Sequence, residues 1–344
     1  MTRAVMFLVA GALALALSIG CRDEATPPHG GSSATAVEPA PVRSGPDAKP
    51  AAPAPDPWSV PAGSSDEPPG LAATHALADK TCPTVAKPYF YRVEKAGKVS
   101  HFLGTRHLGV SLDKMPQVVK REIAAAKLAV FEVAPGDDTD PDRGDGASLA
   151  DKLGAKTWTH YRELVGANLA TELEHAPPAM AMILLISMYE DKLSALDGEI
   201  EKLVLAKKIP TKGLETSAFQ DRVLAELLDL RMLRATIDGT KDRAQLERES
   251  VQDLGEYCAG TDSEPGMDGE TRAILLAGGY TAAEIDALDD KLVYSRNRDW
   301  IPKLEPILAR GGAVIVVGAD HLIGDKGVIA MLQARGYQAT RVAP

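Results

Sequence analysis

The sequence contains no run of basic residues. Acidic residues outnumber basic ones by 48 to 38, and the formal net charge is -10 at pH 7. A protein that binds nucleic acid needs a basic patch to pair with the phosphate groups, so we expect no nucleic-acid partner. The sequence also lacks a His-Glu-x-x-His motif, which excludes the zinc peptidases that carry two metal ligands and a general base on one helix.

The N-terminal residues 1–21 are expected to be an export signal and not part of the fold. Residues 4–19 form an apolar stretch that is shorter than a membrane-spanning helix needs. The segment ends at Cys21 in a pattern that resembles a bacterial lipoprotein signal, although Ser18 stands where leucine is usual. An ordinary cleaved signal is the alternative. Lipid chains on Cys21 would anchor the protein to a membrane, since each buried CH2 adds about 0.8 kcal/mol.

The next stretch, residues 22–77, is rich in Pro, Ala, Gly and Ser and has almost no large apolar residues. Such a stretch buries too little surface to offset the entropy lost on ordering. We therefore predict a disordered tether, followed by one domain over residues 78–344. By resemblance to lipoprotein sorting rules, Arg22 after the cysteine favours an exported protein on the outer membrane, facing the periplasm.

Cysteine is scarce, with three residues in the chain. If Cys21 carries lipid, Cys82 and Cys258 remain, and an even pair in an exported protein is a disulfide candidate. The bond would tie the start of the domain to the end of its helical region. Two separate free thiols are the alternative. A cysteine metal site is not expected, because neither residue has a cysteine or histidine at ligand spacing.

Two stretches far apart in the chain share one pattern: a short apolar run, a glycine, and a histidine three residues later. The first contains Gly104 and His107, and the second contains Gly318 and His321. The apolar runs predict buried strands, and we expect each glycine to permit a sharp exit from its strand. The histidines then follow strand ends, where α/β proteins build their sites. The sequence predicts two half-units that bring these imidazoles together.

The first half-unit is predicted as a hairpin over residues 88–103, a helix over 114–127 and a strand over 128–133, with parallel strands on either side of the helix. Glu132 lies in the last strand among apolar residues, where burial without a partner is costly. Side-by-side strand ends would place Glu132 within reach of His107. The alternative is an exposed position on an edge strand.

Residues 145–310 are predicted to be mainly helical, with a short strand that ends at Glu215. A second half-unit follows over residues 313–342. The expected fold is therefore an α/β (α+β) split sheet of two β-Gly-x-x-His-α-β half-units with a large helical insertion that covers the strand ends. Arg296 and Arg298 lie in the last helix of the insertion, either on its solvated face or as planar donors to a carboxylate or a polarised carbonyl.

Five segments in this order resemble the TraB/PrgY/GumN family, which includes the Tiki proteins, over residues 85–343. The segments are residues 103–109, 131–132, 213–216, 296–297 and 317–324, followed by 336–337.

The resemblance implies an exported or membrane-tethered domain, and for the Tiki branch it implies metal-dependent proteolysis. By position, His107, Glu132 and His321 become the expected metal ligands, and Glu215 and Arg296 the expected proton shuttle and oxyanion donor. The ligand types suit Zn, Mn or Co. Asp320 departs from the small residue that family members often carry before the second histidine, and it would add a ligand or a supporting hydrogen bond.

We therefore expect a metal-dependent hydrolase, a peptidase that acts on a peptide or protein substrate outside the cytoplasm. One alternative is a non-catalytic lipoprotein that binds a peptide or small ligand under its helical lobe. Another is a pure scaffold lipoprotein, for which the histidines would be structural.

Overall fold

The structure is a computed structural model that describes residues 68–137, 146–261 and 266–343. The expected export signal with Cys21 and most of the expected tether lie outside these residues. Within the described ranges, no helix combines the length and the apolar character needed to cross a membrane.

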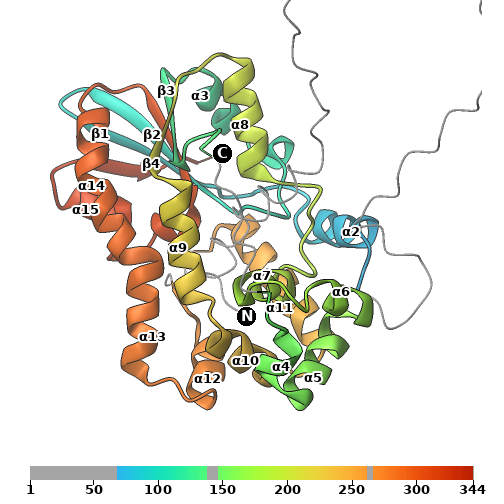
Figure 1. The fold of residues 1–344 in the computed structure, drawn as a ribbon. Helices are drawn as coiled ribbons and strands as arrows, with labels where there is room; N and C mark the ends of the chain where they lie inside the picture. The colour runs from blue at the N-terminus through green and yellow to red at the C-terminus, as the bar shows by residue number, and fades with distance from the viewer. Residues whose placement is uncertain (1–67, 138–145, 262–265, 344) are drawn as a thin grey trace, which may run out of the picture.

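The described residues form a six-stranded mixed sheet (Figure 1) in the order β4-β3-β5-β2-β1-β6. The β4, β3, β5 and β2 strands run parallel, and β1 is antiparallel to both β2 and β6. All four parallel strands therefore end at the same edge of the sheet. The strands are β1 (Tyr89–Lys95), β2 (Lys98–Thr105), β3 (Leu128–Val133), β4 (Thr211–Glu215), β5 (Ala313–Gly318) and β6 (Gln338–Arg341).

The strand order confirms the predicted hairpin and corrects the predicted half-units. The β1 and β2 strands pair across Ala96 and Gly97, whose positive φ angles of 50° and 75° suit a two-residue hairpin turn. However, β5 lies between β2 and β3, so the ends of β2 and β3 are not adjacent as expected. The closing strand β6 pairs with β1, and both β2 and β1 lie between β6 and β5. The second half-unit is therefore not a copy of the first.

Helices cover both faces of the sheet because its central strands are apolar on both sides. Phe102 and Ile315 face α14 (Ser295–Leu308) and α15 (Val328–Gln333). The alternate positions, such as Leu103, face the opposite layer of helices. In Figure 1 the α14 and α15 helices lie at the left of the molecule, below β1. The opposite layer consists of α2 (Leu71–Thr81), α3 (Gln117–Ala124), α8 (Leu196–Ala206) and α11 (Arg243–Ala259).

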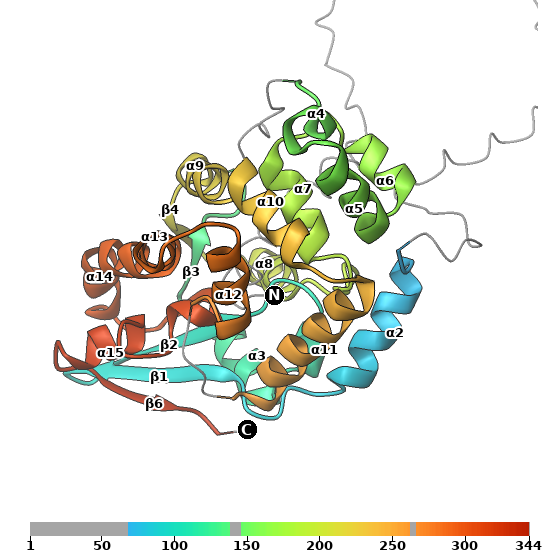
Figure 2. The same ribbon diagram turned by 90° about the horizontal axis from the view of Figure 1, so that it is seen from below.

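The predicted helical insertion is a lobe built from the chain segments that follow β3 and β4, at the edge where the parallel strands end. Figure 2 shows its first helices far from β1 and β6. The lobe contains α4 (Leu149–Leu153), α5 (Ala155–Val165), α6 (Ala167–Glu172), α7 (Pro178–Ile186), α9 (Ser217–Leu227), α10 (Leu230–Gly239), α12 (Gly269–Ala277) and α13 (Ala282–Asp289). A π-helical turn, Asp290–Tyr294, joins α13 to α14.

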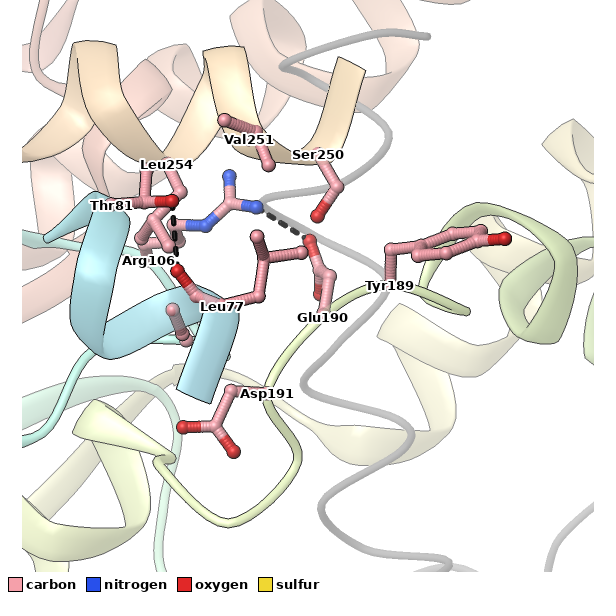
Figure 3. Close-up of a pocket in the computed structure, with 11 residues that line it drawn as sticks. Leu77, Thr81, Arg106, Tyr189, Glu190, Asp191, Ser250, Val251 and Leu254 are labelled. Carbon is pink, nitrogen blue, oxygen red and sulfur yellow. Dashed lines mark hydrogen bonds and ion pairs between the residues drawn. The ribbon is translucent and has the colours of Figure 1, made fainter. Parts of the chain in front are cut away.

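The chain after β2 is joined to the lobe by buried polar contacts. Arg106 donates from Nη2 to Glu190 Oε1 at 2.7 Å, and the Gly109 amide donates to the carbonyls of Asp191 and Ser194 at 3.0 and 2.9 Å. Figure 3 shows Arg106 reaching Glu190 between α2 and α11. The cavity beside this pair measures about 10 Å³, which is room for about one water molecule. These contacts are therefore structural, and they fix the segment that contains His107.

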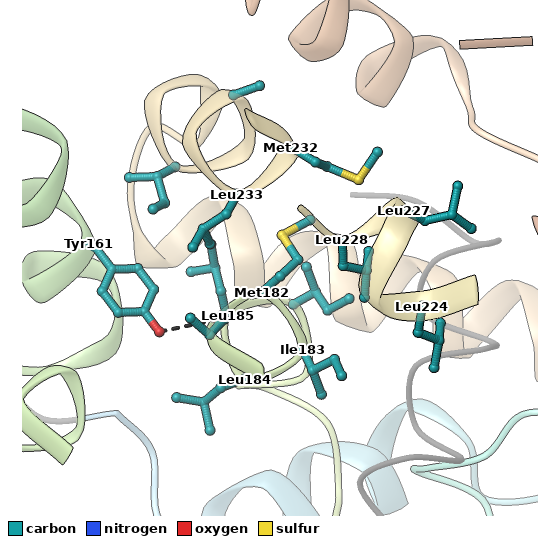
Figure 4. Close-up of a cluster of buried hydrophobic side chains, with 14 of the residues drawn as sticks. Tyr161, Met182, Ile183, Leu184, Leu185, Leu224, Leu227, Leu228, Met232 and Leu233 are labelled. Carbon is teal, nitrogen blue, oxygen red and sulfur yellow. Dashed lines mark hydrogen bonds between the residues drawn. The ribbon is translucent and has the colours of Figure 1, made fainter. Parts of the chain in front are cut away.

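The lobe has an apolar core of its own (Figure 4). Helix α7 begins at the Pro177-Pro178 pair, with proline at its first position. Tyr161 is fully buried, and its hydroxyl donates to the Ala181 carbonyl at 3.1 Å. The methionines of this region lie in or against the core: Met180, Met182 and Met188.

Helix α2 begins at Leu71, so the prediction that the tether extends to residue 77 is wrong at its C-terminal end. A disulfide joins Cys82, just after α2, to Cys258 in α11, with the two Cα atoms 5.8 Å apart. His75 and Asp79 also attach α2, to Asp191 at 2.8 Å and to Lys114 at 2.7 Å. The N-terminal helix is thus fixed to the opposite layer.

Candidate functional site

The shared edge of the parallel strands brings together the side chains that the sequence singled out. His107 follows β2, His321 closes the 3-10 turn Ala319–His321 after β5, and Glu132 lies near the end of β3. His321 Nε2 is 3.8 Å from Glu132 Oε1. Both histidines are close enough for their charges to act on the pKa of Glu132. The structure therefore places the two Gly-x-x-His motifs and the glutamate at the same edge of the sheet.

The two motif glycines act differently from the expected sharp turns. Gly104 is the second-last residue of β2, and a Cβ there would lie 2.8 Å from the Ala319 Cα and 2.9 Å from the Tyr89 Cβ. Gly318 has φ -53° and ψ 141°, which other residues adopt readily, and its amide donates to Glu132 Oε1 at 2.7 Å. Gly104 is needed for close packing, and Gly318 supplies a backbone donor to the site.

Glu132 is buried and paired, which excludes the exposed edge position. Oε2 accepts from Arg296 Nη2 at 2.7 Å and from Gln220 Nε2 at 3.1 Å, while Oε1 accepts from Gly318. Burial acts to raise its pKa, but the charges of Arg296 and of both histidines, with the Gly318 hydrogen bond, together lower that pKa to about 2. Glu132 is therefore an anion held inside the protein.

Glu215 is placed as a support for Arg296. Its Oε1 accepts from Arg296 Nη2 at 2.5 Å, and its Oε2 accepts from Arg296 Nε and from Trp300 Nε1, each at 3.1 Å. Gln220 adds a fourth donor at 3.3 Å. Burial raises the pKa of Glu215 despite the nearby guanidinium. These four contacts occupy both oxygens, so the geometry does not favour the proton shuttle that the family resemblance implied.

Arg296 and Arg298 have opposite surroundings, although only one residue separates them on α14. Arg296 is 2% exposed and bridges Glu132 and Glu215, and its Nη1 donates to the Leu292 carbonyl at 3.1 Å. Arg298 is exposed and pairs with Asp290 on the surface. The donor interpretation therefore applies to Arg296, and the solvated-face interpretation applies to Arg298. Because its donors are engaged by carboxylates, Arg296 holds Glu132 in place.

His321 is enclosed between Asn297, Trp300 and Glu132. Its Nδ1 lies 2.6 Å from Asn297 Oδ1, and its ring centroid is 4.3 Å from that of Trp300. Nε2 is buried and has no hydrogen-bond partner among the described residues. Burial, reinforced by Arg296 and His107 and opposed by Glu132, lowers the pKa of His321 to about 3. The ring is therefore neutral at physiological pH.

His107 has a carboxylate partner that the sequence reasoning missed. Its Nδ1 lies 2.6 Å from Asp197 Oδ2, and Asp197 Oδ1 accepts from Thr105 Oγ1 at 2.7 Å. Burial lowers the pKa of His107, but Asp197, with smaller contributions from Glu132 and Glu190, outweighs it and raises that pKa. Asp197 lies in the first turn of α8, where an acidic residue is ordinary because it complements the helix dipole, so no sequence signal distinguishes it.

The donor chemistry of the site fits a divalent metal in part. In the described ranges, no three His, Cys, Asp or Glu side chains are grouped so that they would hold a metal ion. However, Nε2 of His107 and Nε2 of His321 are both buried without a hydrogen-bond partner from the described part of the chain. Each Nδ1 faces an oxygen, which is the arrangement that metal-bound histidines adopt. Asp320 is buried beside His321 on the same turn.

A larger groove is lined by Arg296. It encloses about 400 Å³ between β4, α9 and α14, and its lining includes Glu215, Phe219, Trp300 and Lys303. His107 and His321 do not line this groove. Trp300, which lines the groove, also packs against the His321 ring.

Comparison with known proteins gives one match. A family model described as the TraB/PrgY/gumN family matches residues 89–341, a span that includes the whole sheet and all the site residues described above. No curated protein and no solved structure matches the chain.

Proposed function

The chain belongs to the TraB/PrgY/gumN family, and on that premise we propose that it is a metal-dependent hydrolase, a peptidase that acts on a peptide or protein substrate outside the cytoplasm. The observation that carries the proposal is the pair of buried Nε2 atoms, one on His107 and one on His321, beside an anionic Glu132. A buried nitrogen lone pair without a donor is costly unless a ligand uses it. Two such atoms next to a carboxylate support a cation as that ligand.

Nε2 of His107, Nε2 of His321 and the Glu132 carboxylate would hold the ion, which we propose to be Mn, Co or Zn. When bound, the ion would supply an activated water and polarise a scissile carbonyl. Arg296 keeps Glu132 ionised and fixes its Oε2, so that Oε1 faces His321. Trp300 covers one side of the His321 ring and limits the access of water to it.

The runner-up function is a lipoprotein of the same fold that binds a peptide or small ligand without turning it over. The lining of the large groove favours this function, because Glu215 and Arg296 line the groove and the histidines do not. The histidine side chains are nearly closed to solvent, with exposed fractions of 10% for His107 and 1% for His321. A ligand that filled only the groove would leave the paired imidazoles untouched.

Elemental analysis of the purified full chain tests the first function. We expect near-stoichiometric Mn, Co or Zn, lost in His107→Ala and in His321→Ala while circular dichroism shows both variants folded. His175→Ala is the matched control, because His175 is exposed and far from the site in sequence; it should keep the metal. Absence of metal from the wild-type protein after incubation with all three ions would refute the metal-dependent function and leave the binding function.

The proposed location is the cell envelope, with the chain held to a membrane through lipid on Cys21. The N-terminal segment motivates this location, and the disulfide between Cys82 and Cys258 supports an oxidising compartment.

A further inference from the structure

Two helices each present one side-chain oxygen to one of the site histidines. Asp197 extends from the first turn of α8, and Asn297 from the first turn of α14. Each oxygen lies 2.6 Å from the Nδ1 atom that it faces, on His107 and on His321 respectively. A neutral imidazole carries one proton, on either Nδ1 or Nε2, and its neighbours decide which.

At His321 the orientation of the Asn297 amide decides the position of the proton. Asn297 Nδ2 lies 3.0 Å from the backbone carbonyl of Lys326. A carbonyl oxygen accepts hydrogen bonds and donates none, so the amide must direct its NH2 group to Lys326. Oδ1 then faces His321, and Nδ1 of the ring must be the donor. The lone pair of the neutral ring is therefore on Nε2, the atom that lies 3.8 Å from Glu132.

At His107 the Asp197 carboxylate has the same effect. A carboxylate accepts hydrogen bonds and donates none, so Nδ1 of His107 is again the donor, and in the neutral ring Nε2 again carries the lone pair. Asp197 also accepts from Thr105, the last residue of β2 and two positions before His107. One side chain thus fixes both the strand end and the ring that follows it.

We propose that Asp197 and Asn297 are positioning residues that hold both imidazoles with the proton on Nδ1, so that the two Nε2 lone pairs face one shared divalent cation. The identity of this ligand rests on the proposed function, whereas the placement of the two protons does not. Asp197 and Asn297 touch neither substrate nor metal in this arrangement. They act through His107 and His321, as oxygen partners of metal-bound histidines do.

Nitrogen-15 NMR of the histidine-labelled full chain tests the placement of the protons directly. In alkaline buffer, where both rings are neutral, we expect Nδ1–H for both histidines in the wild-type protein. Asp197→Leu should convert His107 to a mixture of Nδ1–H and Nε2–H, while Asp197→Asn, which retains an oxygen acceptor, should keep Nδ1–H. Asn297→Leu should have the corresponding effect on His321. Nε2–H on either ring of the wild-type protein would overturn the proposal.

Metal titration of the same proteins adds a second measurement. We expect Asp197→Leu to weaken the binding of Mn, Co or Zn by roughly 10- to 100-fold, with most of the affinity retained in Asp197→Asn. Asp197 is 29% exposed, so its substitution carries the test if the buried Asn297→Leu variant does not fold. Unchanged affinity in Asp197→Leu would overturn the positioning role. A wild-type protein that binds no metal would instead refute the proposed function, and the NMR result would still decide the positions of the protons.

Discussion

Arg296 is shared between two buried glutamates whose pKa values differ. Its Nη2 lies 2.7 Å from Glu132 Oε2 and 2.5 Å from Glu215 Oε1. Burial acts to raise the pKa of both carboxyls, yet only Glu132 reaches a pKa of about 2, whereas the pKa of Glu215 stays raised. The difference follows from the Gly318 amide and the two histidines, which act on Glu132 alone. The carboxyl group that faces His321 is thus the more acidic of the two.

Removal of the Arg296 guanidinium should therefore destabilise the protein. We expect Arg296→Met to lower the free energy of unfolding by about 3–5 kcal/mol, because it leaves Glu132 and Glu215 buried without their cation. Arg298→Met is the matched control on the same helix. It should lower the free energy of unfolding by no more than about 1 kcal/mol, since the pair of Arg298 with Asp290 is on the surface. Urea unfolding of the three proteins measures both values. Equal effects of the two substitutions would contradict the bridging role.

The sequence predicted the principal site residues but not the side chains that position them. Glu132 was identifiable because a charged residue within an apolar strand requires a partner. Asp197 and Gln220 reach the site only through the packing of α8 and α9 against the strand ends. Local patterns report on periodicity and turn chemistry, and they do not report which distant side chains meet in space. For this reason the partner of His107 could not be predicted.

At the scale of elements, local patterns located the strands but not their order. Each apolar run became a strand close to its predicted bounds, since burial on both faces leaves a clear signature. Consecutive strands are usually neighbours, which favoured the pairing of β2 with β3. The strand β5 lies between them although it is distant from both in sequence, so local patterns do not predict its place. This order places His321, which follows β5, between the strand that precedes His107 and the strand that carries Glu132.

The contact between β2 and the turn after β5 depends on Gly104. We expect Gly104→Ala to lower stability by about 1–3 kcal/mol, because the new Cβ would overlap Ala319 and Tyr89. Gly198→Ala is the matched control: nothing lies within 4 Å of a Cβ built there, and alanine in helix α8 should raise stability by about 0.5 kcal/mol. Thermal unfolding of both variants shows whether each substitution lowers or raises stability. A neutral result for Gly104→Ala would show that the turn after β5 moves away readily.

At the scale of the whole molecule, the chain leaves the sheet for the lobe and returns twice. Helix α11 packs beneath the sheet with α2, and α14 covers the opposite face. The helix α2 escaped prediction because it buries only Thr74 and Ala78 and has little apolar periodicity. It is held instead by contacts with distant residues, among them the disulfide from Cys82 to Cys258.

This disulfide connects the stability of the molecule to the compartment in which it folds. It closes a span of 176 residues, and the loss of a native disulfide typically costs about 2–5 kcal/mol. We expect the chain expressed without residues 1–21 to remain in a reducing compartment, with Cys82 and Cys258 as free thiols and stability lower by that amount.

The full chain should be oxidised and recovered with the membrane fraction. Cys21→Ser separates the two effects, because it should be oxidised but released from the membrane. Thiol counting, guanidinium unfolding and membrane fractionation measure the three properties. A full chain with reduced Cys82 and Cys258 would contradict export, and a membrane-bound Cys21→Ser protein would contradict the lipid anchor.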